Sequence, residues 1–125
     1  MKPARTLHAF DVWIAGQVCA TQINARNVQA ARYQYFRDVR EWRPAVRYIE
    51  VKARRAGPPV TTDHHRAALA RRGRPELVAG ARVVVGGEPG FITGSNCSSN
   101  FDVLLDHLRF ALNVHPTDIT LETST

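Results

Sequence analysis

The chain has 125 residues, 44% apolar and 22% charged, a composition typical of a globular protein rather than a disordered one. Residues 1–82 carry 16 of the 17 Lys and Arg and 6 of the 11 Asp and Glu, a formal +10, whereas residues 83–125 carry a formal −4. No run of 18 apolar residues predicts a transmembrane helix, and the first ten residues lack the apolar core of a secretory signal.

Two strands are predicted near the N-terminus. Apolar side chains alternate with other residues over 10–14, the period of two that is typical of a half-buried strand. A second run over 18–23 follows Gly16, so the pair predicts a hairpin that turns near this glycine. Trp13 falls on the other side of the first strand. We expect it either on an exposed sheet face or at the seam with a second module.

Residues 26–42 predict the longest helix, with Asn24 as its N-cap and Pro44 after its end. One side is apolar and is expected to pack on the sheet. Its members are Val28, Ala31, Tyr35, Val39 and Trp42. The opposite side carries Arg26, Tyr33, Arg37 and Arg40. Because this second set has no acidic member, it indicates either a phosphate-binding surface with one stacking aromatic or a solvated helix face.

Residues 46–55 predict a third strand with one apolar and one polar, basic side. The apolar side has Ile49, Val51 and Ala53, and the polar side has Tyr48, Glu50, Lys52 and Arg54, with Arg55 following. The order strand, strand, helix, strand predicts a basic α+β module over residues 1–56, with one helix on one sheet face.

A linker with a short helix is predicted over residues 57–78. The Ala-Gly-Pro-Pro sequence at 56–59 breaks regular structure, and a helix is expected over 63–72. Thr61 or Thr62 would cap this helix. Arg71 and Arg72, near its C-terminal end, are further candidate contacts for an anion or a partner.

Short strands separated by Gly, Asn and Pro turns predict a small β-barrel over residues 79–125. They are expected at residues 81–85, 91–93, 101–105, 112–114 and 119–121. The fold class predicted for the whole chain is therefore α+β, with a small strand-strand-helix-strand module, a short helix and a C-terminal barrel.

Two segments of this region carry a resemblance. Residues 78–85, followed by Gly-Gly-Glu-Pro-Gly-Phe-Ile-Thr-Gly at 86–94, resemble the opening of an SH3-like barrel of the KOW type. Residues 100–106 and 112–119 resemble its later strands and closing turn. The whole chain also resembles small uncharacterised bacteriophage-encoded proteins with Phe-Asp-Val-Trp near the start and Leu-Asn-Val-His-Pro near the end. The resemblance implies a barrel, and relatives of the KOW type often bind RNA, ribosomal components or polymerase.

No enzyme, cofactor or metal site is predicted. Adjacent His64 and His65 would point about 100° apart on a helix, which disfavours one shared metal ion. The ingredients of a catalytic triad are present, but their spacing does not indicate a common site. They are Cys97 or Ser98, His107 or His115, and Asp102, Asp106 or Asp118.

Two non-enzymatic functions stay open. In the first, an arginine-rich face binds nucleic acid or a ribonucleoprotein. Its candidate residues are Arg26, Tyr33, Arg37, Arg40, Tyr48, Lys52, Arg54, Arg55, Arg71 and Arg72. In the second, the chain is a protein–protein interaction module that binds or inhibits a host protein, or binds a second copy of itself as a homodimer.

The cysteines bear on the compartment. Cys19 and Cys97 lie far apart and outside any CxxC pattern, which favours reduced thiols over a structural disulfide. We therefore expect a cytoplasmic protein, in the host cytosol if a phage encodes it.

Overall fold

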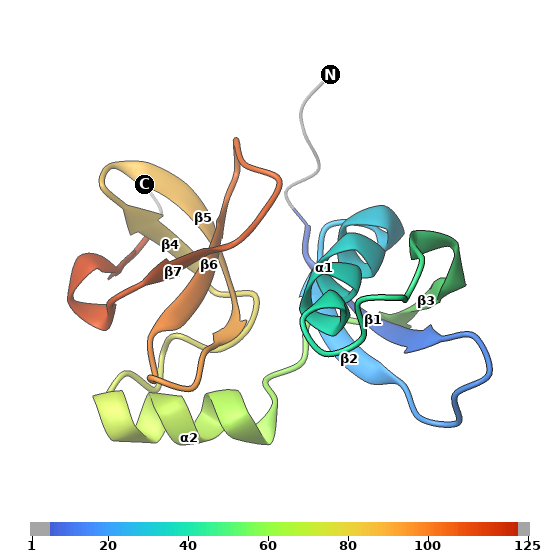
Figure 1. The fold of residues 1–125 in the computed structure, drawn as a ribbon. Helices are drawn as coiled ribbons and strands as arrows, with labels where there is room; N and C mark the ends of the chain where they lie inside the picture. Colours follow the sequence, from blue (N-terminus) through green and yellow to red (C-terminus); the bar gives the residue numbers. More distant parts are fainter. Residues whose placement is uncertain (1–5, 123–125) are drawn as a thin grey trace. The chain divides into compact units, whose positions relative to one another are not determined.

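The computed structural model describes residues 6–122, and over this range the chain is a mixed α+β protein with two α-helices and two antiparallel sheets (Figure 1). The chain divides into two compact units between Pro58 and Pro59. We call residues 6–58 the N-terminal unit and residues 59–122 the C-terminal unit. None of the helices in the described range is both long and apolar enough to cross a membrane.

The N-terminal unit is a three-stranded antiparallel sheet with one helix packed on one face (Figure 1). Its elements are β1 (His8–Ile14), β2 (Thr21–Ala25), α1 (Val28–Arg40), the 3₁₀ helix η1 (Tyr48–Glu50) and β3 (Val51–Gly57). Strand β1 is central and pairs with β2 on one side and β3 on the other. The predicted order of strand, strand, helix and strand is confirmed.

One face of this sheet is buried because it packs on α1. Phe10 and Val12 of β1, Ile23 of β2 and Val51 of β3 form a cluster with Ala31 of α1. Burying each of the larger side chains stabilises the folded state by roughly 1.5–3 kcal/mol. This cluster therefore decides which face of the sheet the helix covers.

Helix α1 is shorter than predicted at both ends. Its N-cap is Asn27, whose Oδ1 accepts a hydrogen bond from the Ala30 backbone N–H at 2.8 Å. The predicted cap, Asn24, is instead a buried residue of β2. The helix ends at Arg40, so Trp42 lies beyond it with 63% of its surface exposed and does not pack on the sheet as predicted.

The start of β2 also differs from the prediction. This strand begins at Thr21 rather than at residue 18, because residues 15–20 belong to the loop of the β1–β2 hairpin. Val18, in that loop, is fully exposed. The chain does turn at Gly16, where φ is 92° and the Gln17 N–H donates to the Ile14 carbonyl at 2.9 Å, but the loop then continues to Ala20 before β2 begins.

Only the second half of the predicted third strand forms a strand. Its first part forms η1, so Ile49 is 67% exposed instead of facing the helix. The cause is local, since the Glu50 carboxylate accepts the Arg47 backbone N–H at 2.9 Å and the Glu50 N–H donates to the Arg47 carbonyl at 2.9 Å. These bonds close a turn that an extended strand cannot form.

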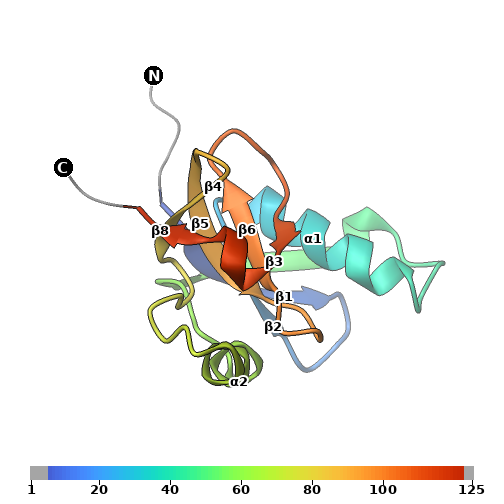
Figure 2. The same ribbon diagram turned by 90° about the vertical axis from the view of Figure 1, so that its left-hand side faces the viewer.

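The C-terminal unit is a five-stranded antiparallel sheet with α2 beside it (Figure 2). Its elements are α2 (Asp63–Arg72), β4 (Arg82–Val85), β5 (Glu88–Ser95), β6 (Phe101–Leu105), β7 (Leu112–Val114), the 3₁₀ helix η2 (Pro116–Asp118) and β8 (Thr120–Leu121). The strand order is β7-β6-β5-β4-β8, so β4 to β7 form a meander and β8 returns to β4. Over the described residues the sheet is open between β7 and β8, and no closed barrel is formed.

The β4–β5 hairpin turns more tightly than predicted. Its two loop residues, Gly86 and Gly87, have φ angles of 58° and 83°, the left-handed conformation that two-residue hairpin turns require. The strand that follows begins at Glu88 instead of residue 91. Pro89 and Gly90 therefore belong to the sheet and not to the turn.

His65 ties α2 to the sheet of the C-terminal unit. Its Nε2 donates to the Leu77 carbonyl at 2.8 Å and its Nδ1 accepts the Ser95 hydroxyl, an arrangement that requires the neutral ring. The buried ring meets Phe101 edge-on, with centroids 5.5 Å apart. Burial lowers the pKa of His65, and this effect outweighs the raising effects of the Leu77 hydrogen bond and the Asp102 charge.

We predict that the C-terminal unit loses stability between about pH 7.5 and pH 5.5. The unfolded chain takes up a proton at His65 near its ordinary pKa of 6.5, whereas the folded unit resists protonation, so acidification favours unfolding. Urea midpoints at the two pH values measure the effect. The variant His65→Gln should flatten this dependence and His64→Gln should keep it; a pH dependence unchanged in His65→Gln would contradict the assignment.

We also predict that Gly90→Ala destabilises the C-terminal unit by roughly 2 kcal/mol. A Cβ on Gly90 would lie 2.6 Å from the Leu104 carbonyl oxygen and 2.8 Å from the Leu105 Cα, and backbone cannot move away cheaply. Gly94→Ala in the same strand is the matched control, because its Cβ would meet only Asp102 Oδ2, at 3.8 Å. Thermal unfolding should separate the two variants; equal midpoints would refute the prediction.

Candidate nucleic-acid interface

The ten predicted contact residues fall into three groups. Five lie in or next to α1 and η1, and they are Arg26, Tyr33, Arg37, Arg40 and Tyr48. Three lie on β3, and they are Lys52, Arg54 and Arg55. The remaining two, Arg71 and Arg72, lie on α2 in the C-terminal unit. The residues expected to form a single arginine-rich face are therefore divided between two units and, within the N-terminal unit, among different elements.

Arg71 and Arg72 hold a loop of their own unit. Arg71 Nε donates to the Ser99 hydroxyl at 2.7 Å. Arg72 donates to the carbonyls of Ser98 and Ser99 and to Asn100 Oδ1, at 3.0–3.2 Å. Because these bonds engage one or more donors of each guanidinium group, the two arginines hold the β5–β6 loop of their own unit.

Two further arginines of the C-terminal unit, Arg82 and Arg74, also make contacts within it. Arg82 forms two hydrogen bonds with the Asp106 carboxylate, both 2.8 Å, and one with Glu122 at 2.7 Å. The bonds to Asp106 raise the pKa of Arg82 further above its ordinary value. Arg74 contacts Glu76 at 2.7 Å and donates to the carbonyls of Pro116 and Ile119. These cations serve internal contacts.

The structural boundary between Pro58 and Pro59 changes how the net charge is divided, compared with the sequence halves 1–82 and 83–125. The N-terminal unit carries nine Lys and Arg against four Asp and Glu, a formal +5, whereas the C-terminal unit carries six against seven, a formal −1. Lys2 and Arg5 lie outside the described residues. The positive field that could attract a polyanion belongs to the N-terminal unit.

The two predicted stacking tyrosines do come together. The rings of Tyr33 and Tyr48 are 6.5 Å apart, and Phe36 lies 5.5 Å from Tyr48. Arg32 covers Tyr48 with its guanidinium carbon 4.3 Å from the ring centroid, and it donates to the carbonyls of Val51 at 2.8 Å and Tyr48 at 3.2 Å. This cluster attaches η1 to α1, so Tyr48 already contributes its ring to internal packing.

Arg32 and Phe36 are residues that sequence reasoning missed. On the helical wheel they lie between the predicted apolar side and the predicted basic side. Arg40 places its guanidinium carbon 5.3 Å from the Phe36 ring. The sequence held no signal for the role of Arg32, because its hydrogen-bond acceptors are backbone carbonyls of a segment 16–19 residues away.

A second aromatic–cation arrangement lies on the sheet face turned away from α1. The β1–β3 register pairs Trp13 with Lys52 and Asp11 with Arg54, and paired residues share one face of a sheet. The Arg54 guanidinium carbon lies 5.8 Å from the Trp13 ring centroid, and Arg54 Nε is 3.4 Å from Asp11 Oδ2. Arg55, which pairs with Phe10, falls on the α1 side instead.

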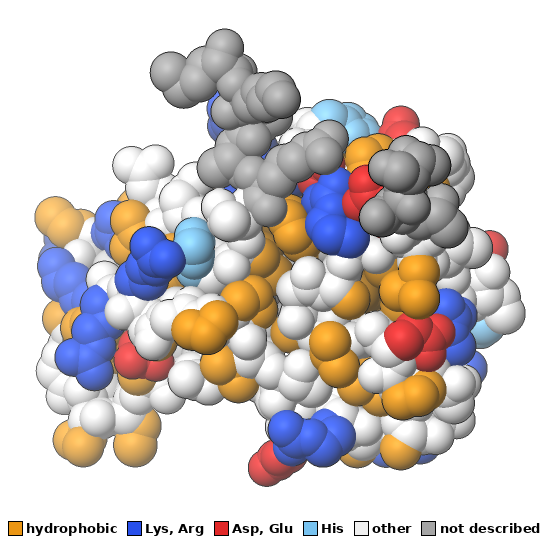
Figure 3. Space-filling view, turned by 180° about the vertical axis from the view of Figure 1, so that it is seen from behind, with side chains coloured by type: hydrophobic (Ala, Val, Ile, Leu, Met, Phe, Trp, Pro, Cys, Tyr) orange, Lys and Arg blue, Asp and Glu red, His pale blue; other side chains and the backbone are white. Residues whose placement is uncertain are grey.

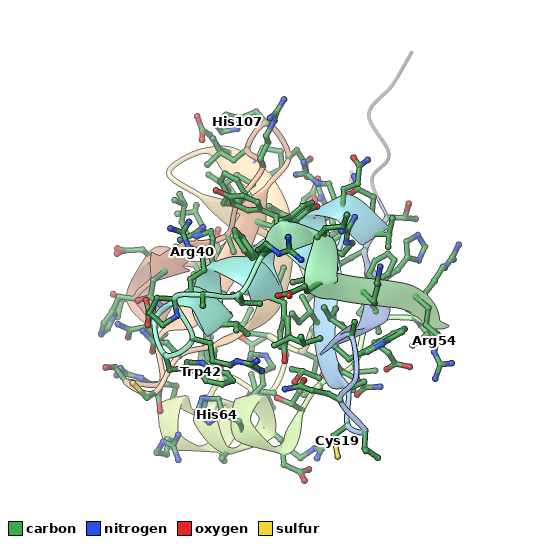
Figure 4. The ribbon with its side chains drawn as sticks, turned by 45° about the vertical axis from the view of Figure 1, so that its right-hand side comes forward. Cys19, Arg40, Trp42, Arg54, His64 and His107 are labelled. Carbon is green, nitrogen blue, oxygen red and sulfur yellow. The ribbon has the colours of Figure 1, made fainter. Side chains whose placement is uncertain are left out.

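We call Trp13, Lys52 and Arg54 the sheet platform. Figure 3 shows the molecule from behind, with Lys and Arg side chains beside hydrophobic ones on the N-terminal unit. In Figure 4, Arg54 extends from β3, whereas Arg40 and Trp42 lie at the end of α1. The platform is thus separate from the basic side of the helix.

A shallow pocket of about 200 Å³ adjoins the platform. It is lined by Trp13, Gln17, Val18, Cys19, Ala20 and Arg54. The walls come from the long β1–β2 loop on one side and from β3 on the other. A mostly apolar lining with one amide, from Gln17, and one cation, from Arg54, suits a flat, partly polar ligand.

Two of the histidines considered for a triad have other partners. His107 Nε2 is 3.4 Å from Glu88, and His115 Nδ1 is 2.8 Å from the Thr117 hydroxyl, so both rings contact residues other than the candidate nucleophiles. Among residues 6–122, no group of three His, Cys, Asp or Glu side chains could hold a metal ion.

Comparison with known proteins adds no relative. No protein-family model matches the chain, and neither a curated protein nor a solved structure shows significant similarity to it. The functional argument therefore depends on the site itself.

We predict that Arg32→Met destabilises the N-terminal unit by about 1–3 kcal/mol, because two backbone carbonyls lose a charged donor. Arg40→Met removes the same charge at an exposed position of the same helix and should change stability by less than about 0.5 kcal/mol. Urea unfolding of the two variants provides the comparison. Equal loss in both would show that the Arg32 contacts contribute nothing specific.

Proposed function

We propose that the N-terminal unit binds nucleic acid through the sheet platform. The observation that carries this proposal is the position of Trp13, opposite Lys52 in the strand register and next to the Arg54 guanidinium. An aromatic ring can stack on a base while the two cations neutralise neighbouring phosphates. The proposal keeps Lys52 and Arg54 from the sequence prediction and adds Trp13.

The electrostatics support the same surface. Arg54 is 74% exposed, and its 3.4 Å contact with Asp11 is a surface ion pair of the kind that contributes about 0–1 kcal/mol. A phosphate can therefore compete for the guanidinium at little cost. The formal +5 of the unit would draw a polyanion toward it, and binding should weaken steeply with salt.

For the C-terminal unit we infer an SH3-like architecture. The support is the strand order, in which a four-strand meander is completed by a last strand that returns to the first, with a short 3₁₀ helix before it. Four of its arginines, Arg71, Arg72, Arg74 and Arg82, hold loops and strands of their own unit, and its formal charge is −1, so we assign it no direct contact with nucleic acid. The exposed thiols of Cys19 and Cys97 fit a reducing, cytoplasmic setting.

A second candidate function is protein binding. Trp42 and Ile49, both more than 60% exposed, lie in the segment that connects α1 to β3. Exposed aromatic residues near arginines are typical of interface hot spots. The partner would be a host protein or a second copy of the chain. A chain that binds no nucleic acid even at low salt would leave this function as the better explanation.

We predict that Lys52→Glu/Arg54→Glu weakens oligonucleotide binding at least about tenfold. The slope of log Kd against log salt should fall by roughly 0.7–0.9 for each lost phosphate contact. Fluorescence anisotropy with a labelled random-sequence oligonucleotide measures both quantities, and thermal unfolding confirms that the variants fold.

The matched control is Arg37→Glu/Arg40→Glu, which changes the net charge equally but on α1. This control should lose only the long-range electrostatic attraction to the oligonucleotide, so its affinity should fall less than that of the platform variant. If this control loses more affinity than the platform variant, the basic side of α1 is the binding surface and the platform assignment is wrong.

A further inference from the structure

Resting on the proposed function, we infer that the pocket beside Trp13 receives one unstacked base of a single-stranded nucleic acid. The base lies flat between the Trp13 ring and the Arg54 guanidinium. Lys52, opposite Trp13 in the register, contacts the adjoining phosphate. The ligand class is therefore single-stranded DNA or RNA, and the contact is made by stacking.

The pocket is built for a flat ligand. It combines one aromatic wall, Trp13, with Val18, Cys19, Ala20 and the polar Gln17 from the hairpin loop, and it is open to the surface. Its volume of about 200 Å³ accommodates one base but not a base pair together with its backbone. The loop is long because β2 starts at Thr21, and this length provides the wall that a two-residue turn would lack.

The distance between the Trp13 ring and the Arg54 guanidinium is close to the separation that an inserted base requires. Stacked bases follow one another about every 3.4 Å, so a base between the two groups requires about 7 Å. The guanidinium carbon now lies 5.8 Å from the ring centroid. Arg54 must therefore move outward by only about 1 Å, and its side chain is 74% exposed, held by one long contact to Asp11.

A duplex cannot satisfy this site. Within a double helix each base is already stacked on both faces, so entry into the pocket would require unstacking and unpairing, which costs several kcal/mol. A single strand offers bases that turn out freely, and sequence-tolerant binders hold them on aromatic side chains. The structure thus favours single strands over duplexes of the same sequence.

Tryptophan fluorescence tests the inference directly, because the chain has only two tryptophans, Trp13 and Trp42. The variant Trp42→Phe, at an exposed position, leaves Trp13 as the sole reporter. Titration with a mixed-sequence 12-nucleotide single strand at low salt should quench its emission, since a stacked base removes excited-state energy. The reciprocal variant, Trp13→Phe, leaves Trp42 as the reporter, and its emission should stay unchanged.

Affinity measurements complete the test. Trp13→Ala should weaken single-strand binding about tenfold to a hundredfold, the range expected when one base loses its stacking partner, while Trp13→Phe should retain most of it. The corresponding duplex should bind more weakly to the unaltered chain and leave Trp13 emission unchanged. Thermal unfolding of each variant ensures that lost binding is not lost folding.

The outcomes separate this inference from the proposed function. Single-strand binding that leaves Trp13 emission unchanged, or equal affinity for duplex and single strand, would overturn the stacked-base site but leave nucleic-acid binding intact. Absence of binding to both forms at low salt would overturn the proposed function and this inference together. Quenching of Trp42 in place of Trp13 would move the site to the end of α1 and refute it.

Discussion

A three-stranded sheet with one helix in its own unit can bury only one face within that unit, and this constraint governs the N-terminal unit. Because side chains alternate along a strand, the packing of Val12 and Val51 against α1 forces Trp13 and Lys52 onto the opposite face together. A shift of the register by one residue would exchange the two faces and destroy the core. The platform geometry is therefore maintained by the same contacts that stabilise the unit.

Arginine side chains have two roles in this protein, internal hydrogen bonding and exposure at the surface. In the C-terminal unit the planar, multiply donating guanidinium group joins loops and strands, as Arg72 does for the β5–β6 loop and Arg82 for Asp106 and Glu122. In the N-terminal unit Arg32 has the same internal role, but Arg54 makes only one long contact with a carboxylate and remains mostly exposed. Counting arginines cannot separate these roles, since each depends on which acceptors the fold brings near.

Sequence periodicity predicted the element order because alternation in β1 and the helical pattern of α1 are local properties. It failed where a neighbouring residue offered an alternative hydrogen bond. Asn27 caps the helix in place of Asn24, and the hydrogen bonds between Glu50 and Arg47 form a turn where the strand was expected to start. For the site, alternation correctly placed Lys52 and Arg54 on one side of β3. It could not exclude Arg71 and Arg72, because their acceptors lie 26–28 residues away, nor show that Arg54 lies over Trp13.

The two exposed thiols provide natural probes of ligand binding. Cys19 lines the pocket, whereas Cys97 lies in the β5–β6 loop of the other unit, and both are exposed and unpaired. A molecule seated in the pocket would shield the first sulfur from alkylation while the second continued to react as an internal reference. Mass spectrometry of the two peptides would then measure occupancy in the unaltered protein, free of any engineered label.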